Sequence, residues 1–131
     1  MTLSYLRERL VLLQSLLHSS SLRIGSAHDE LAHYFIEENK IESALYHLSE
    51  SVSILEHHLE PEDPTLIREI LKMSEVFLCS ENPEKELAIK LVFLLDRSIV
   101  GEEGSHELRG RLETQVIKVK HVLNMNFGSL K

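Results

Sequence analysis

Histidine is the residue type in this sequence best suited to metal or acid–base chemistry, and the chain of 131 residues contains eight of them. The segment HDELAH carries His28 and His33, but a zinc-binding helix needs two histidines four residues apart on one face. A separation of five turns the two rings roughly 140° apart around a helix. The adjacent His57 and His58 diverge as well. We therefore expect no metal site.

The sequence gives little support to nucleophilic catalysis or phosphate binding. Its single cysteine, Cys79, has no evident base beside it, so we interpret it as a structural thiol. There is no G-x-S-x-G segment. The segment GEEG at 101–104 lacks the lysine of a phosphate-binding loop. We expect a protein that is not an enzyme, has no catalytic residue and uses no cofactor.

Composition narrows the classes of partner and compartment. A formal net charge of −7 argues against nucleic acid and against anionic membranes. No apolar run reaches the roughly 20 residues that span a bilayer. One cysteine argues against a disulfide framework, and the sequence therefore predicts a cytoplasmic or nuclear protein.

Apolar residues recur at helical spacing, and no long stretch alternates with the period of a strand. The prolines, and the glycines at 25, 101 and 104, fall between these apolar runs. The pattern predicts an all-α fold of six antiparallel helices with short connections. The six apolar stripes cover residues 3–17, 28–35, 41–59, 67–78, 88–99 and 108–123.

Four segments carry the chemistry of a helix start. SAHD at 26–29 and NKIE at 39–42 have the form of a capping box or its close relative. Asp63 and Asn82 each stand directly before a proline, which favours an N-cap followed by proline at the first helical position. These segments predict the starts of the second to fifth helices.

The sequence also repeats. ILEHHLEPEDPT at 54–65 aligns with LLDRSIVGEEGS at 94–105, an offset of 40 residues. Each copy has two large aliphatic residues, an acid, a polar pair and an aliphatic residue, followed by an acidic turn. LLHSSSLRIGSAHD, which starts at Leu16, is a looser third copy. Helix pairs that repeat at this spacing are typical of an α-solenoid.

Small residues predict how the pairs pack. Ala32 and Ser74 occupy equivalent positions, and a phenylalanine follows each by three residues. We expect Ala32 to face Ala44 and Ser74 to face Ala88, because helices approach closely only where side chains are small. The phenylalanines would fill the wedge where each pair diverges.

LAHYFIEENKIESALYHLSESVSIL at 31–55 resembles a tetratricopeptide repeat. Asn39 stands where that family has glycine, and asparagine tolerates the same left-handed backbone. The signature positions of the resemblance are Leu31, Ala32, Phe35, Ala44, Leu48 and Ser51.

Over about residues 16–100 the chain is more similar to the C-terminal helical domain of SET-and-MYND protein-lysine methyltransferases. LRIGSAHDELAHYF and ALYHLSESVSILEHHLEPEDP carry this likeness. The SET and MYND parts themselves have no counterpart here, so no catalytic residue is carried over. The linker LEPEDPTL is also similar to the long repeats of kinesin light chains.

The resemblance implies a tetratricopeptide-like domain over residues 1–124. The single apolar stripe of the last helix indicates a capping helix with one solvated face, and we expect a flexible tail at 125–131. The first helix would be the second helix of a truncated repeat. It is apolar on nearly every side, which is typical of a helix buried all round. Either it docks onto a missing neighbour or self-associates, or a self-contained six-helix bundle wraps it internally.

The resemblance also implies a concave groove lined by the first helix of each pair. Its mainly acidic lining suits a basic or apolar peptide. The family's clamp for carboxylates uses lysine and asparagine, whereas Asp29 and His33 stand at those positions here. The implied groove residues are Asp29, His33, Ile36 and Glu37, together with Arg68, Glu75 and Leu78.

We therefore expect a non-catalytic protein–protein interaction module that binds a protein or peptide. The resemblance implies the accessory domain of a SET-and-MYND methyltransferase, with an upstream SET domain as partner. The alternatives are a stand-alone peptide-binding scaffold and a cargo-binding fragment like that of kinesin light chains.

Overall fold

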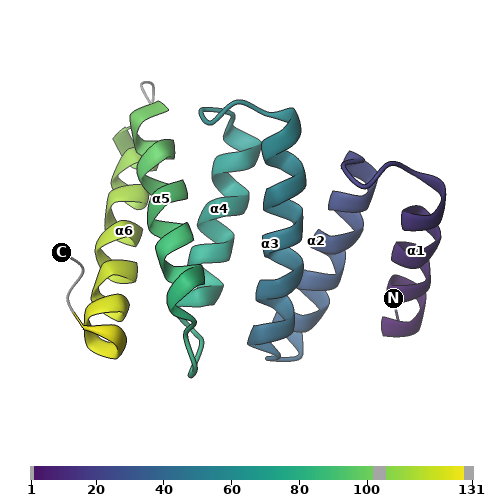
Figure 1. Ribbon diagram of the computed structural model, residues 1–131, viewed down its shortest axis with the longest axis horizontal. Helices are drawn as coiled ribbons and strands as arrows, with labels where there is room; N and C mark the ends of the chain where they lie inside the picture. Colours follow the sequence, from purple (N-terminus) through teal and green to yellow (C-terminus); the bar gives the residue numbers. More distant parts are fainter. Residues whose placement is uncertain (1, 102–105, 129–131) are drawn as a thin grey trace. The chain divides into compact units, whose positions relative to one another are not determined.

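The computed structural model describes residues 2–101 and 106–128, and within these ranges the chain forms six α-helices and no strand (Figure 1). This confirms the predicted all-α fold. The helices are α1 (Leu3–Leu16), α2 (Leu22–Glu37), α3 (Ile41–His58), α4 (Pro64–Phe77), α5 (Lys85–Gly101) and α6 (His106–Phe127).

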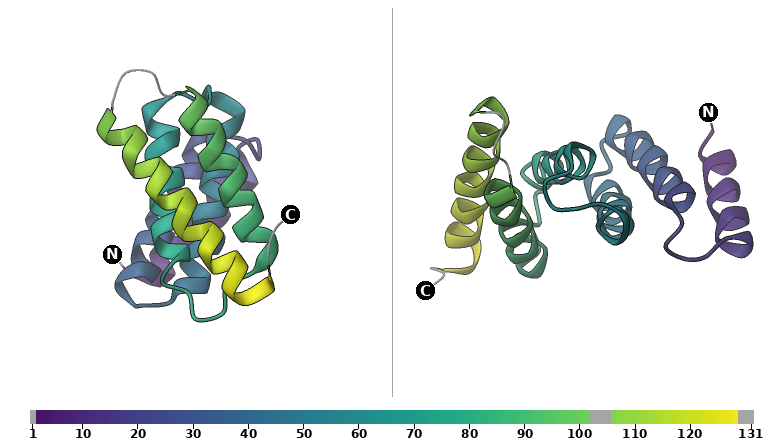
Figure 2. Two further views of the ribbon diagram at one scale, coloured as in Figure 1. Left: turned by 90° about the vertical axis from the view of Figure 1, so that its left-hand side faces the viewer. Right: turned by 90° about the horizontal axis from the view of Figure 1, so that it is seen from above.

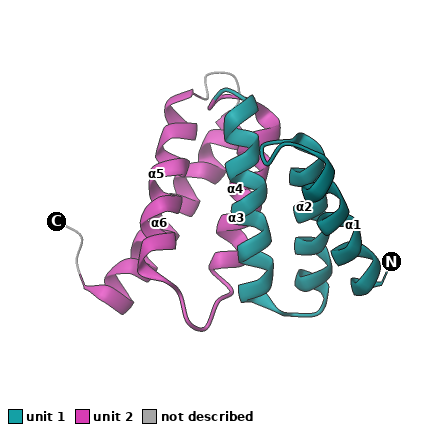
Figure 3. Cartoon of the chain, turned by 45° about the vertical axis from the view of Figure 1, so that its right-hand side comes forward, with its two compact units in different colours: residues 1–60 teal, residues 61–131 magenta. Residues whose placement is uncertain are grey.

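The chain divides into two compact units, Met1–Glu60 and Pro61–Lys131 (Figure 3). The first unit contains α1 to α3 and the second contains α4 to α6. The sequence predicted one repeat domain over residues 1–124. A continuous solenoid through both units stays a prediction.

In the first unit successive helices run in opposite directions, and α2 contacts both α1 and α3 (Figures 1 and 2). The α2–α3 pair is the more extensively packed of the two contacts. Ala32 and Ala44 are completely buried on these two helices, together with Leu31 and Leu48. Their burial is what the predicted close approach at small residues requires.

Gly25 lies inside α2, although the sequence analysis placed it between helices. A Cβ atom at Gly25 would lie 3.2 Å from the Cγ2 atom of Ile54 on α3, so the glycine allows the two helices to approach closely. The helix begins at Leu22, where the Ser21 side chain accepts a hydrogen bond of 3.2 Å from the backbone N–H of Arg23. The predicted capping box at 26–29 is therefore wrong, because these residues lie within the helix.

The other predicted helix starts have mixed outcomes. Asn39 adopts a left-handed backbone with φ of 56°, as the resemblance implied. The N-cap of α3 is nevertheless Lys40, which makes no side-chain capping bond, so the box at 39–42 does not form. Asp63 caps α4 as predicted and accepts a 2.8 Å hydrogen bond from the N–H of Thr65. Asn82 does not cap α5, which begins only at Lys85.

In the second unit α5 packs against both α4 and α6, and α4 also contacts α6. Ser74 and Ala88 are completely buried, and Phe77 is almost so. The Ser74 hydroxyl donates a 2.7 Å hydrogen bond to the carbonyl oxygen of Leu71, which satisfies this buried polar group. The most extensive contact in the unit joins α5 and α6.

Helix α6 buries one stripe, as expected for a helix with a solvated face. It extends to Phe127, so residues 125–127 of the predicted tail belong to the helix; the flexibility of the tail stays a prediction, and residues 129–131 lie outside the described ranges. Local hydrogen bonds stabilise this helix end. Gly128, with φ of 83°, donates its N–H to the carbonyl oxygen of Asn124, and the Asn126 amide donates to that of Val122.

The described helices leave part of α1 uncovered, which corrects the alternative of a bundle that wraps it internally; docking of α1 onto a missing neighbour, or self-association through it, stays a prediction. The helix buries one stripe, Leu6, Leu10 and Leu13, and packs against α2. Leu3 is half-buried, and four other large apolar side chains of α1 are more than half exposed: Tyr5, Val11, Leu12 and Leu16. No helix in the described ranges combines the length and the apolar character of a membrane span.

Candidate functional site

The clearest candidate site is a hollow of about 300 Å³ in the first unit. Helix α2 supplies most of its lining with Glu30, His33, Tyr34 and Glu37, and α1 supplies Leu6. The α2 residues lie three or four positions apart, so they share the helical face that α2 turns toward α1. We call these five residues the α1–α2 hollow.

One ion pair and one polar contact involve residues of this lining. Arg9 on α1 pairs with Glu30 on α2 at the hollow. Along α2, His33 Nε2 lies 3.5 Å from Asp29 Oδ2. Glu37 is exposed and Tyr34 is half-buried. The hollow therefore combines an exposed carboxylate, an aromatic ring and the buried apolar side chain of Leu6.

The charge of the first unit favours a cationic ligand. Residues 1–60 contain nine acidic residues against four lysines and arginines, a net charge of −5 from the total of −7. Arg9 balances Glu30 locally, which leaves Glu37 as the acid most available at the hollow. An ammonium or guanidinium group would be attracted both to this carboxylate and to the face of Tyr34.

Two of the four groove residues predicted on α2 line the hollow, namely His33 and Glu37. Asp29 is not part of the lining, but its carboxylate contacts the His33 ring, which is. Ile36 is half-buried and does not line the hollow. Glu30 and Tyr34 were not among the predicted groove residues, although both fall at helical spacing from Glu37.

The other three predicted groove residues lie in the second unit. Arg68 and Glu75 are exposed on α4, and Leu78 is the half-buried residue that ends this helix. Glu75 forms an ion pair of 3.2 Å with Arg111 on α6. A single groove that contains both predicted groups stays a prediction.

The histidines of HDELAH diverge as expected. His28 is buried with 3% of its surface exposed, whereas His33 is exposed. Among the described residues, no three histidine, cysteine or acidic side chains come together in a way that could hold a metal ion. Cys79 is an exposed free thiol that lies 3.5 Å from the carbonyl oxygen of Glu75. Of the GEEG segment, only Gly101 lies within the described ranges.

Comparison with known protein families, with curated proteins and with solved structures finds no match to this chain. The tetratricopeptide and SET-and-MYND resemblances therefore stay predictions.

Proposed function

We propose that the protein is a non-catalytic interaction module that binds a basic segment of a partner protein at the α1–α2 hollow. The observation that carries this proposal is the lining itself: two glutamates, a histidine and a tyrosine gather around an apolar side chain in the more acidic half of the sequence.

The size of the hollow limits what it holds. A volume of about 300 Å³ is at the lower end of the range for small-molecule sites. It suits one or two long side chains of a peptide better than a whole cofactor. A lysine or arginine would lay its aliphatic stem against Leu6 and place its charge near Glu37 and Tyr34.

A labelled peptide rich in lysine and arginine tests this proposal by fluorescence anisotropy. We expect it to bind, and an acidic peptide of equal length not to bind. Removing the charge at the hollow in Glu37→Gln should weaken binding by about tenfold, the cost of losing one charge-assisted hydrogen bond.

Glu38→Gln is the matched control. It changes the net charge of the protein equally, but Glu38 is an exposed neighbour outside the hollow lining. If both variants weaken binding equally, the attraction comes from net charge rather than from the hollow. Failure of the basic peptide to bind would refute the proposed function.

A second candidate is an accessory domain of a protein-lysine methyltransferase, and the exposed apolar side chains of α1 favour it. Val11, Leu12 and Leu16 are each more than half exposed, and a SET domain that docks on α1 would cover them. Mixing the purified chain with a SET-domain fragment should then give a complex in analytical ultracentrifugation. Leu12→Gln should abolish this complex and leave peptide binding at the hollow unchanged; two separate species in the mixture would rule this candidate out.

A further inference from the structure

Two histidines meet inside the first unit, on the face of α2 that packs against α3. The Nδ1 atoms of His28 and His47 lie 2.9 Å apart, which is the distance of a hydrogen bond. His28 is 3% exposed and His47 is half-buried. At this distance one Nδ1 must carry a proton and donate it, and the other must be unprotonated and accept it.

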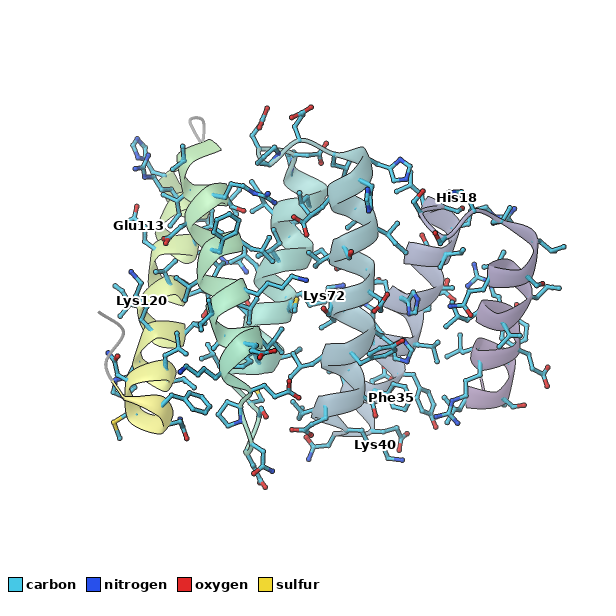
Figure 4. All side chains as sticks on the ribbon, viewed as in Figure 1. His18, Phe35, Lys40, Lys72, Glu113 and Lys120 are labelled. Carbon is cyan, nitrogen blue, oxygen red and sulfur yellow. The ribbon has the colours of Figure 1, made fainter. Side chains whose placement is uncertain are left out.

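Rings and charges from all three helices surround the pair. His47 stacks on Phe35 of α2 with 5.6 Å between ring centroids, and Tyr46 of α3 meets His28 edge-on at 6.3 Å. From α1, the Arg7 guanidinium lies 5.9 Å from the centroid of the Phe35 ring. From α3, Glu50 acts on the charge of His28. Phe35 lies toward the end of the unit where Lys40 joins α2 to α3 (Figure 4).

The number of protons on the two rings determines whether the hydrogen bond between them can form. One added proton converts one ring to imidazolium and preserves the Nδ1–H···Nδ1 bond. A second proton leaves two donors and no acceptor, and it places two positive charges side by side within the helix interface. The second protonation therefore breaks the hydrogen bond and makes the two rings repel each other.

We propose that the His28–His47 pair is an acid-sensitive switch that joins α2 to α3 at neutral pH and loosens the first unit when both rings are charged. The switch does not depend on the proposed function.

The electrostatics agree with the geometry. Burial lowers the pKa of His28, and Glu50 partly opposes this effect. Burial, followed by the charges of His28 and Arg7, lowers the pKa of His47 to about 4 from its ordinary 6.5. The unfolded chain therefore binds more protons than the folded chain below pH 6.5. The stability that the pair contributes is fully present above that pH and is lost as the pH falls from 6.5 toward 4.

The test uses the full chain and two readouts. Ring resonances in NMR follow the protonation of each histidine, and urea unfolding at several pH values measures the stability. We expect both His28 and His47 to titrate below 6.5, and the backbone amides of α2 and α3 to lose protection from hydrogen exchange as the second of the two rings becomes charged. Amides of α5 and α6, corrected for intrinsic rates, should keep their protection over the same pH range.

His47→Gln removes the titrating ring but keeps a side chain that can hydrogen-bond to His28. The unfolding constant rises when the pH falls from 7 to 5, and the fold-increase for the wild type should be about ten times the fold-increase for this variant. His57→Gln is the matched control, because His57 is an exposed histidine on the same helix, and it should retain the pH dependence of the wild type.

The proposal is overturned if His28 and His47 titrate near 6.5 while the unit stays folded, or if His47→Gln keeps the full pH dependence. If His47→Gln does not fold, the ring titration and exchange of the wild type decide the question alone.

Discussion

At the scale of single residues, the glycines are the positions whose roles differ most from what the sequence suggested. Two of them mark close contacts instead of turns. Gly25 faces Ile54 within the first unit, and Gly101, the last residue of α5, faces Glu62 within the second. Gly110, in contrast, has open space around the position of a Cβ atom. Local sequence does not distinguish these cases, because the neighbour of each glycine is distant in the chain.

Gly101→Ala and Gly110→Ala should change stability in opposite directions. A Cβ atom at Gly101 would lie 3.1 Å from Glu62 Cβ and 3.4 Å from its Cα and N, and the backbone gives way less easily than a side-chain end. Crowding of about 1–3 kcal/mol should outweigh the helix-forming gain of alanine. At Gly110 only the gain remains, about 0.5–1 kcal/mol.

Urea unfolding of the two variants checks this contrast. A loss of stability for Gly101→Ala and a gain for Gly110→Ala are expected. A gain for both would show that the contact between Gly101 and Glu62 relaxes without cost.

At the scale of elements, the α2–α3 pair combines the most extensive helix packing with the histidine pair. Gly25, Ala32 and Ala44 supply the small side chains, and no large residue could replace them without moving a helix. The repeat analysis found the two alanines because they recur in register. It did not find the His28–His47 contact, since residues 19 positions apart on different helices leave no periodic signal.

A double-mutant cycle tests the close approach of α2 and α3. Gly25→Ala should destabilise the protein because its Cβ atom would meet Ile54 Cγ2 at 3.2 Å. Ile54→Ala should cost about 2–5 kcal/mol through the cavity it leaves. In the double variant the new methyl group no longer meets the Ile54 side chain. The double variant should therefore lose about 1 kcal/mol less stability than the sum of the losses of the two single variants.

The control cycle combines Gly25→Ala with Ile67→Ala. Ile67 is completely buried in the second unit, and these two effects should simply add. Simple additivity in the first cycle would contradict the contact between Gly25 and Ile54.

The first helix shows a limit of reading elements from composition. Its leucines and valine surround it, and the sequence therefore predicted burial on all sides. The structure buries Leu6, Leu10 and Leu13 and leaves Leu12 and Leu16 largely exposed. The apolar composition of a helix predicts that some of its side chains are buried, but the packing of neighbouring helices determines which ones.

At the scale of the whole molecule, the helical class and the number of helices could be predicted from periodicity and punctuation. The start of the second helix was predicted too late because Gly25 was taken as a break, although it lies inside α2. The hollow was predicted only in part. His33 and Glu37 came from the register of the resemblance, whereas Leu6 comes from another helix, and only tertiary packing brings it to Glu37.

The central claim is that the α1–α2 hollow recognises a basic segment, and NMR mapping of backbone amides during peptide titration tests it most directly. The account predicts that a lysine- and arginine-rich peptide shifts the amides of Glu30, His33, Tyr34, Glu37 and Leu6, and that Glu37→Gln reduces these shifts. Shifts confined to α6, or to the exposed side of α1 around Leu12, would contradict it.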